Sequence, residues 1–201
     1  MKEVYGDWKK KKINEVVIDE ENLYYSIEES FGPKIGWKNL DFAGFIKCIT
    51  GGEPSNVGVY ISIEEGWRPS RYPRFYTELL DLEQRFYDTD INFQVVPVPG
   101  KRARGKSVAD QWIIRDATRI LSNPITLREI NTFTVVSSDW IFHPLILADA
   151  AAVGLKAKAI VCRDNFSEQK TSLPEIPGLE EIEIKYLDEI LRENPKLLQK
   201  T

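Results

Sequence analysis

The chain has 201 residues, of which 42% are hydrophobic and 29% charged, and its formal net charge is −4. This balance predicts one globular domain rather than a disordered chain, and the negative charge argues against a protein that binds nucleic acid over its whole surface. Two distant cysteines, Cys48 and Cys162, and a single histidine, His143, exclude a disulfide framework and a multi-histidine zinc site. We expect a cytoplasmic protein, because no apolar run reaches the ~20 residues of a membrane span and no signal peptide is evident.

Five short segments rich in β-branched residues predict strands that are covered on both faces. In chain order they are residues 16–18, 57–63, 93–98, 133–136 and 157–161. The stretches between them predict helices at 40–49, 72–87, 107–121 and 141–153. Because strands and helices alternate, we expect βαβ units and a three-layer α/β/α sandwich with a mainly parallel sheet of about five strands.

We expect three parts along the chain. Residues 1–13 form a basic N-terminal leader, and residues 14–166 form the α/β core. Residues 167–201 form a linker, a short strand and a helix that pack on this core. The helix is expected at 187–193, because a residue before proline is disfavoured in helices and Pro195 follows closely.

Two aspartates stand at the ends of predicted strands. Asp19 follows the first strand and Asp139 follows the fourth. Ligands of parallel α/β sheets bind beyond the carboxyl ends of the strands, so these two side chains are candidate site residues. Each aspartate could instead only cap the helix that follows it, since Asp is a favoured N-cap residue.

The predicted helix 107–121 carries two further aspartates. Asp116 falls within its apolar face, where a carboxylate is costly unless it is paired or binds a metal, and Asp110 falls in the first turn. Asp116 could instead bond to a neighbouring hydroxyl or indole, and Asp110 could be an ordinary first-turn acid. With Asp19 and Asp139, these residues form a candidate cluster of oxygen ligands for Mg²⁺ or Mn²⁺, which suits attack of metal-activated water on a phosphodiester.

Polar and basic residues flank this candidate cluster. Asn22 could hold a carboxylate or a water, and Ser137 and Ser138 could position a water or a phosphate oxygen. The loop before the predicted helix is expected to contact RNA through four basic residues, although these could equally be solvated: Lys101, Arg102, Arg104 and Lys106. A second loop, at 67–76, combines arginines with aromatic residues and has the same two interpretations.

Three segments resemble the motifs of NYN-domain proteins of the LabA-like branch. They are VVIDEENL (16–23), KSVADQWIIRDA (106–117) and VVSSDWIFHPL (135–145), and the similarity spans roughly residues 14 to 190. The resemblance implies a PIN-like fold and a metal-dependent ribonuclease. It also implies that Asp19, Asp110 and Asp139 surround Mg²⁺ or Mn²⁺, with Asp116 as a support or further ligand and Lys106 near the scissile phosphate.

The third motif departs from the family pattern, because Ile141 stands where the family has a second aspartate. Two hypotheses follow. The first is an active ribonuclease that hydrolyses RNA, single-stranded or structured, and the second is an inactive NYN module that binds RNA or a protein partner. A homo-oligomer fits both, and no membrane association is expected. An unrelated phosphohydrolase is less favoured, because the D-x-D pattern is absent after Asp19.

Overall fold

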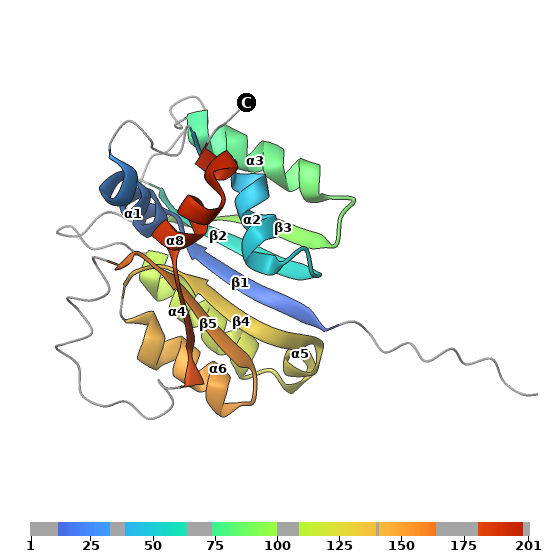
Figure 1. The fold of residues 1–201 in the computed structure, drawn as a ribbon. Helices are drawn as coiled ribbons and strands as arrows, with labels where there is room; N and C mark the ends of the chain where they lie inside the picture. The colour runs from blue at the N-terminus through green and yellow to red at the C-terminus, as the bar shows by residue number, and fades with distance from the viewer. Residues whose placement is uncertain are drawn as a thin grey trace, which may run out of the picture.

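The computed structural model describes residues 12–32, 39–63, 74–99, 109–139, 141–163 and 181–198. These residues form a six-stranded sheet in the order β3-β2-β1-β4-β5-β6, in which every neighbouring pair of strands is parallel. Helices α1, α2, α3 and α8 lie on one side of the sheet and α4, α5 and α6 on the other (Figure 1). The predicted three-layer α/β/α sandwich is therefore confirmed.

The strands contain all five segments predicted from the sequence. Their bounds are β1 Ile13–Asp19, β2 Ser55–Ile63, β3 Ile91–Pro99, β4 Ile130–Val136, β5 Lys156–Val161 and β6 Glu183–Tyr186. The sixth is the short strand expected in the C-terminal part, and it pairs with β5 at the edge of the sheet. Several strands begin earlier than predicted because polar residues at their starts, such as Asn14 and Glu15, also pair with neighbouring strands.

Two helices, at 20–31 and 124–129, lie outside the helical ranges predicted from the sequence. The bounds of the described helices are α1 Glu20–Phe31, α2 Phe42–Thr50, α3 Arg74–Phe86, α4 Ala109–Leu121, α5 Pro124–Glu129, α6 Ala148–Ala152 and α8 Leu187–Glu193. The predicted helix at 141–153 is a π-helical turn, His143–Leu147, followed by the short α6, and a 3₁₀ turn, Pro195–Leu198, follows α8. Helix α5 begins with a proline after its cap Asn123, which is a favourable start for a helix. It was not predicted because its few apolar residues show no helical periodicity.

Two hydrophobic cores lie on opposite faces of the sheet. Alternate residues of β1 serve each core, because successive side chains of a strand point to opposite faces. Val16 and Ile18 are buried with α1, α2 and α8, whereas Val17 is buried with α4 and the π-helical turn. None of the helices in the described ranges combines the length and apolarity that crossing a membrane requires.

The strand order places a switch point between β1 and β4. From β1 the chain continues to β2 and β3 on one side, and from β4 it continues to β5 and β6 on the other. In sheets of this kind a crevice opens where the order reverses, outside the carboxyl ends of the strands. Asp19 ends β1 and Ser137 follows β4, so both residues lie at this edge.

Candidate functional site

Asp19 lies at the switch point and is only 3% exposed. It caps helix α1, because its Oδ1 atom accepts the backbone N–H of Asn22 over 3.3 Å, while its Oδ2 atom accepts the hydroxyl of Ser137 over 3.3 Å. Burial, together with the negative charges of Asp110 and Glu21, raises the pKa of Asp19 to about 7 against the lowering effect of its two hydrogen bonds. A carboxylate in this position favours a proton or a cation beside it.

Asp110, in the first turn of α4, belongs to the same electrostatic cluster. Burial, together with the negative charges of Asp139 and Glu21, raises its pKa to about 6. The loops and helices at the sheet edge thus bring Asp110 close enough to Asp19, Asp139 and Glu21 for their charges to repel, and Asp19 and Glu21 also repel each other. We name these four residues the acidic edge.

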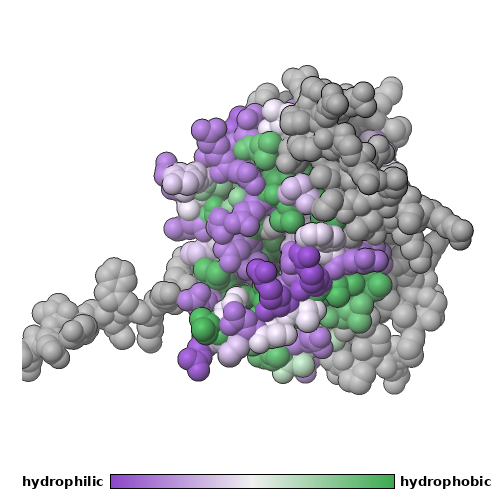
Figure 2. Space-filling model, turned by 180° about the vertical axis from the view of Figure 1, so that it is seen from behind, coloured by the Kyte–Doolittle hydropathy of each residue, from purple (hydrophilic) through white to green (hydrophobic). Residues whose placement is uncertain are grey.

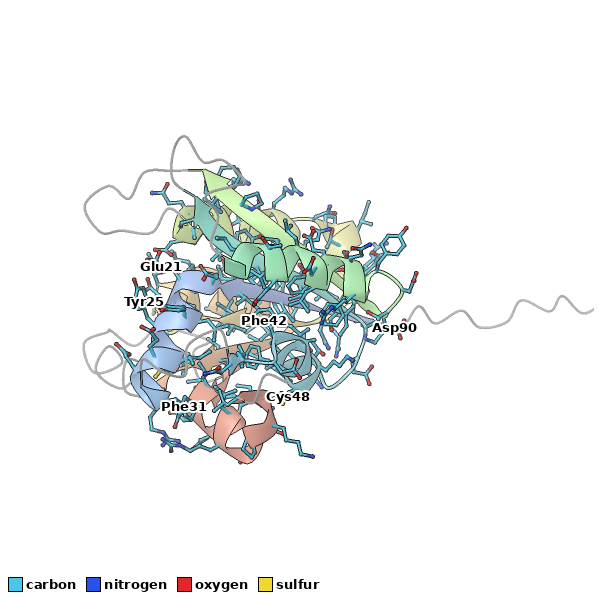
Figure 3. The ribbon with its side chains drawn as sticks, turned by 90° about the horizontal axis from the view of Figure 1, so that it is seen from above. Glu21, Tyr25, Phe31, Phe42, Cys48 and Asp90 are labelled. Carbon is cyan, nitrogen blue, oxygen red and sulfur yellow. The ribbon has the colours of Figure 1, made fainter. Side chains whose placement is uncertain are left out.

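Glu21 was missed by the sequence analysis. It stands in the first turn of α1, two residues after Asp19, and Figure 3 shows it at one end of the sheet, with Asp90 at the opposite end. The signal was present in the sequence as the run Asp-Glu-Glu-Asn at 19–22. It could not be used, because an acid in a first turn is usually explained by the helix dipole alone.

Ser137 forms hydrogen bonds with both Asp19, at the end of β1, and Asp139, after β4. Its hydroxyl is buried, donates to Asp19 and accepts the backbone N–H of Asp139 over 3.1 Å. Asp139 in turn accepts the N–H of Ile141 at its Oδ1 atom over 3.1 Å. Asp19 therefore acts as a helix cap, as the alternative interpretation expected, whereas Asp139 accepts the N–H of the second residue after it and is not the cap of a described helix.

A second network fixes the backbone behind the acids. The side-chain oxygen of Asn22 accepts the N–H of Ser138 over 2.7 Å, and the Ser138 hydroxyl accepts the N–H of Cys162 over 2.7 Å. The hydroxyl of Ser26 lies 3.2 Å from that of Ser138. Asn22, Ser137 and Ser138 are thus engaged with protein groups, which favours a positioning role over the water or phosphate contacts expected from the sequence.

Asp116 has a different environment from the other three predicted acids. Its Oδ2 atom accepts the hydroxyl of Tyr60 over 3.3 Å, and its Oδ1 atom pairs with Arg115 over 2.9 Å. It stands six residues after Asp110, which is about 9 Å along the helix. The structure therefore matches the alternative of a hydrogen bond to a neighbouring hydroxyl, supplied here by a tyrosine.

Several predicted residues cannot be placed at the acidic edge. Lys101, Arg102, Arg104 and Lys106 lie outside the described residues, as does most of the loop at 67–76. Ile141 is 41% exposed, and the side chain of His143 is not described. Within the described ranges, no three side chains of the His, Cys, Asp and Glu types are gathered closely enough to form a ready metal site.

The acidic edge nevertheless has carboxylate oxygens, the ligands that a hard cation prefers. Mg²⁺ is commonly bound through one or two carboxylates, with waters and substrate phosphates as its other ligands. A carboxylate whose pKa is raised by burial and by neighbouring acids gains from a cation, because the positive charge favours the ionised form against both effects. Asp19 and Asp110 both meet this condition.

Comparisons with known proteins agree with the fold. The NYN domain family model matches residues 12–170, which is most of the chain. The crystal structure of a protein of unknown function from Vibrio parahaemolyticus is similar with a TM-score of 0.56 and 16% identity, over 90% of this chain and 95% of that chain. At this identity the likeness shows the fold alone, and a search of the curated proteins found no match.

The family match identifies the superfamily to which the chain belongs. NYN domains are part of the PIN-like nuclease superfamily, whose members are generally metal-dependent ribonucleases that bind RNA. The order of the strands, the carboxyl-end position of Asp19 and Asp139, and the match over residues 12–170 agree with one another. The chain belongs to the NYN domain family.

Proposed function

We propose that this protein is a divalent-metal-dependent ribonuclease that hydrolyses phosphodiester bonds of RNA. The observation that carries the proposal is the repulsion of the Asp110 carboxylate by both Asp19 and Asp139 at the carboxyl-end edge of the sheet. Like charges held close together and away from water destabilise a fold, and such clusters are therefore typical of functional sites.

Mg²⁺ or Mn²⁺ would be held by Asp19, Asp110 and Asp139. Among the described residues, the groups that donate to Asp19 are the N–H of Asn22 and the hydroxyl of Ser137 rather than a lysine or arginine, so they leave its charge unneutralised. Such an ion supplies charge neutralisation at the phosphate and lowers the pKa of water. Glu21 adds a fourth negative charge beside the three proposed ligands.

The residues of the chain would orient the acids and the substrate. Ser137 and the N–H of Asn22 fix both oxygens of Asp19, so that this carboxylate needs little rearrangement when the substrate arrives. In-line attack of water on phosphorus expels the O3′ atom and leaves a 5′-phosphate and a 3′-hydroxyl. The basic loop residues Lys101, Arg102, Arg104 and Lys106 would contact phosphates of the bound strand.

Ile141 supports a second candidate function, an inactive NYN module that binds RNA or a protein partner. An aspartate at this exposed position would add a carboxylate one turn from the acidic edge, and the isoleucine adds none. The lack of three gathered ligands in the described ranges points the same way. In this case the acidic edge would be retained without enough ligands to bind the ion tightly.

A cleavage assay separates the two candidates. Labelled single-stranded RNA is incubated with the full-length protein in Mn²⁺, Mg²⁺ or EDTA, and Asp19→Asn is compared with Asp90→Asn. Asp90 is exposed and stands at the end of the sheet opposite the acidic edge, so its variant is a matched control (Figure 3). A ribonuclease requires metal-dependent cleavage that Asp19→Asn loses and Asp90→Asn keeps. Equal cleavage by both variants, or none with either metal, would reject the proposal.

A further inference from the structure

A polar cavity lies on the α4 side of the sheet, away from the acidic edge. Its volume is about 320 Å³, which is within the range of small-molecule sites. It is formed by three strands and one helix, and its principal lining residues are Glu15, Asn56, Tyr60, Gln94, Asp116 and Arg119. The described surface seen from behind mixes hydrophilic and hydrophobic residues rather than forming one apolar face (Figure 2).

A hydrogen-bonded row of side chains crosses the floor of the cavity. Asn56 donates from Nδ2 to the Oε2 atom of Glu15 over 3.0 Å, and Asn92 donates from Nδ2 to the Oδ1 atom of Asn56 over 3.2 Å. The strand register pairs Glu15 with Asn56 and Asn56 with Asn92, so the three residues share one face of β1, β2 and β3. Valine and isoleucine would be usual on a sheet face under a helix, so this row is built for polar contact.

The next row keeps the floor open and adds an aromatic ring. Gly58 follows Asn56 on the same face, and a Cβ atom there would stand 3.2 Å from the ring of Tyr60. Without that atom, space remains over the backbone of β2. Tyr60 is held in place because its hydroxyl donates to Asp116. The floor therefore combines a flat backbone surface with amide groups and a fixed ring edge.

Two lining side chains have hydrogen-bonding groups to spare. Gln94 on β3 and Arg119 on α4 are both exposed, and neither makes an ion pair or side-chain hydrogen bond within the described ranges. An amide supplies both donors and acceptors, and a guanidinium binds phosphate through two parallel N–H groups. The cavity wall can therefore bind a polar ring and a phosphate at the same time.

The carboxylate of Glu15 indicates which polar ring would fit the cavity. Burial raises the pKa of Glu15 to about 7, against the lowering effect of the bond from Asn56 to its Oε2 atom, so its charged form gains from further N–H donors. A carboxylate with two oxygens is best satisfied by two adjacent N–H groups. Of the four RNA bases, only guanine presents two adjacent donors, N1–H and the N2 amino group, on its Watson–Crick edge.

We propose that this cavity is a guanine-binding subsite, in which Glu15 accepts from N1–H and N2–H of the base while Gln94 and Arg119 contact the rest of the nucleotide. The assignment of that guanine to a single-stranded RNA substrate rests on the proposed function. Helix α4 connects the two sites, since Arg119 stands about 14 Å along the helix from Asp110. A short single-stranded segment spans this separation, and bases of such segments are read by their Watson–Crick edges.

Binding of free nucleotides tests the subsite without any cleavage. The full-length protein is titrated with GMP, IMP, AMP, CMP and UMP in EDTA by calorimetry, and the side-chain amide signals of Asn56, Asn92 and Gln94 are followed by NMR. GMP should bind most tightly and shift these signals. IMP lacks only the N2 amino group, and should bind about fivefold to tenfold more weakly if that group donates to Glu15.

Variants identify the cavity as the place of binding. Glu15→Gln, which replaces one acceptor oxygen by a donor, should reduce the preference for GMP over AMP about tenfold. Gln94→Ala and Arg119→Ala should weaken GMP binding, whereas Gln84→Ala and Arg85→Ala should not, because these exposed controls lie on α3, across the sheet. The subsite is rejected if no nucleotide shifts the three amide signals, if all five bind equally, or if Glu15→Gln keeps the preference.

The same experiment separates this proposal from the ribonuclease assignment. Asp19→Asn should bind GMP as the wild type does, because Asp19 does not line the cavity. A protein that binds GMP but cuts no RNA would keep the subsite and reject the nuclease. A protein that cuts RNA but binds no GMP would keep the nuclease and reject the subsite.

Discussion

The hydroxyl of Ser137 donates to the Oδ2 atom of Asp19 over 3.3 Å, and the Oγ atom of that hydroxyl accepts the backbone N–H of Asp139 over 3.1 Å. One buried side chain thereby connects the acid that ends β1 with the acid that follows β4. The two aspartates are 120 positions apart in the sequence, and strand pairing alone brings their backbones together. Ser137 adds the contact that orients the carboxylate.

Replacing Ser137 by alanine should therefore impair the acidic edge more than the fold. Asp19 loses a donor that lowers its pKa, so its charged form becomes still less favourable and its affinity for a cation falls. We expect Mn²⁺ affinity and RNA cleavage to fall about tenfold, with a loss of about 1 kcal/mol in unfolding free energy. Ser122→Ala, at an exposed turn, is the control. Unchanged Mn²⁺ affinity in Ser137→Ala, measured by calorimetry, would contradict this role.

Removing the charge of Asp19 should stabilise the metal-free protein. The pKa of Asp19 is about 7 in the folded state, above its ordinary value of 3.8, so the folded state disfavours the charged form. The resulting destabilisation is absent below pH 3.8, grows as the pH rises to 7, and is complete above pH 7. In EDTA at pH 8, Asp19→Asn should thus unfold at a higher temperature than the wild type, because its unfolding free energy is larger by on the order of 2 kcal/mol. At pH 4 the two proteins should differ little.

Added Mn²⁺ should reverse this order. A ligand that binds only the folded state raises its stability in proportion to the logarithm of the ligand concentration. The wild type should therefore gain thermal stability as Mn²⁺ is added, and Asp19→Asn should gain much less. Thermal unfolding in EDTA and in a Mn²⁺ series measures both effects. Equal gains in the two proteins would show that Asp19 does not bind the ion.

The acids at strand ends were predictable because topology alone determines where a strand delivers its last residue. Asp19 ends β1 and Asp139 comes three residues after the end of the adjacent parallel strand β4, so no detail of packing was needed to expect them at one edge. Asp116 and Glu15 were not predictable in this way. Helical spacing places Asp116 on an inward face, but the partner on that face, Tyr60, comes from a strand 56 positions earlier.

Glu15 shows the same limit within a strand. The sequence predicted a strand from residue 16, because only the apolar residues gave a signal. The structure extends β1 back to Ile13 and pairs Glu15 with Asn56. That row becomes visible only when the register of three strands is known, since each of its residues is ordinary in its own segment.

Asp116 should be dispensable for cleavage. Its carboxylate accepts a hydrogen bond from Tyr60, which links α4 to β2, and pairs with the adjacent Arg115 within α4. Asp116→Asn should therefore keep cleavage within about threefold of the wild type while lowering the unfolding free energy by about 1 kcal/mol. Tyr60→Phe removes the other half of the bond and should behave alike. Loss of metal-dependent cleavage in Asp116→Asn alone would instead make Asp116 a ligand, as the family motif implies.

Ile141→Asp should strengthen metal binding at the acidic edge. Ile141 is 41% exposed and its backbone N–H bonds to the Oδ1 atom of Asp139, so an aspartate there lies beside a proposed ligand and buries little new charge. We expect Mn²⁺ affinity to rise about tenfold and cleavage to rise with it. In EDTA the variant should be slightly less stable than the wild type, because another negative charge joins Asp139. Leu145→Asp, 45% exposed within the π-helical turn, is the matched control and should change neither quantity. If both variants bind Mn²⁺ as the wild type does, Ile141 is not the position that limits the site.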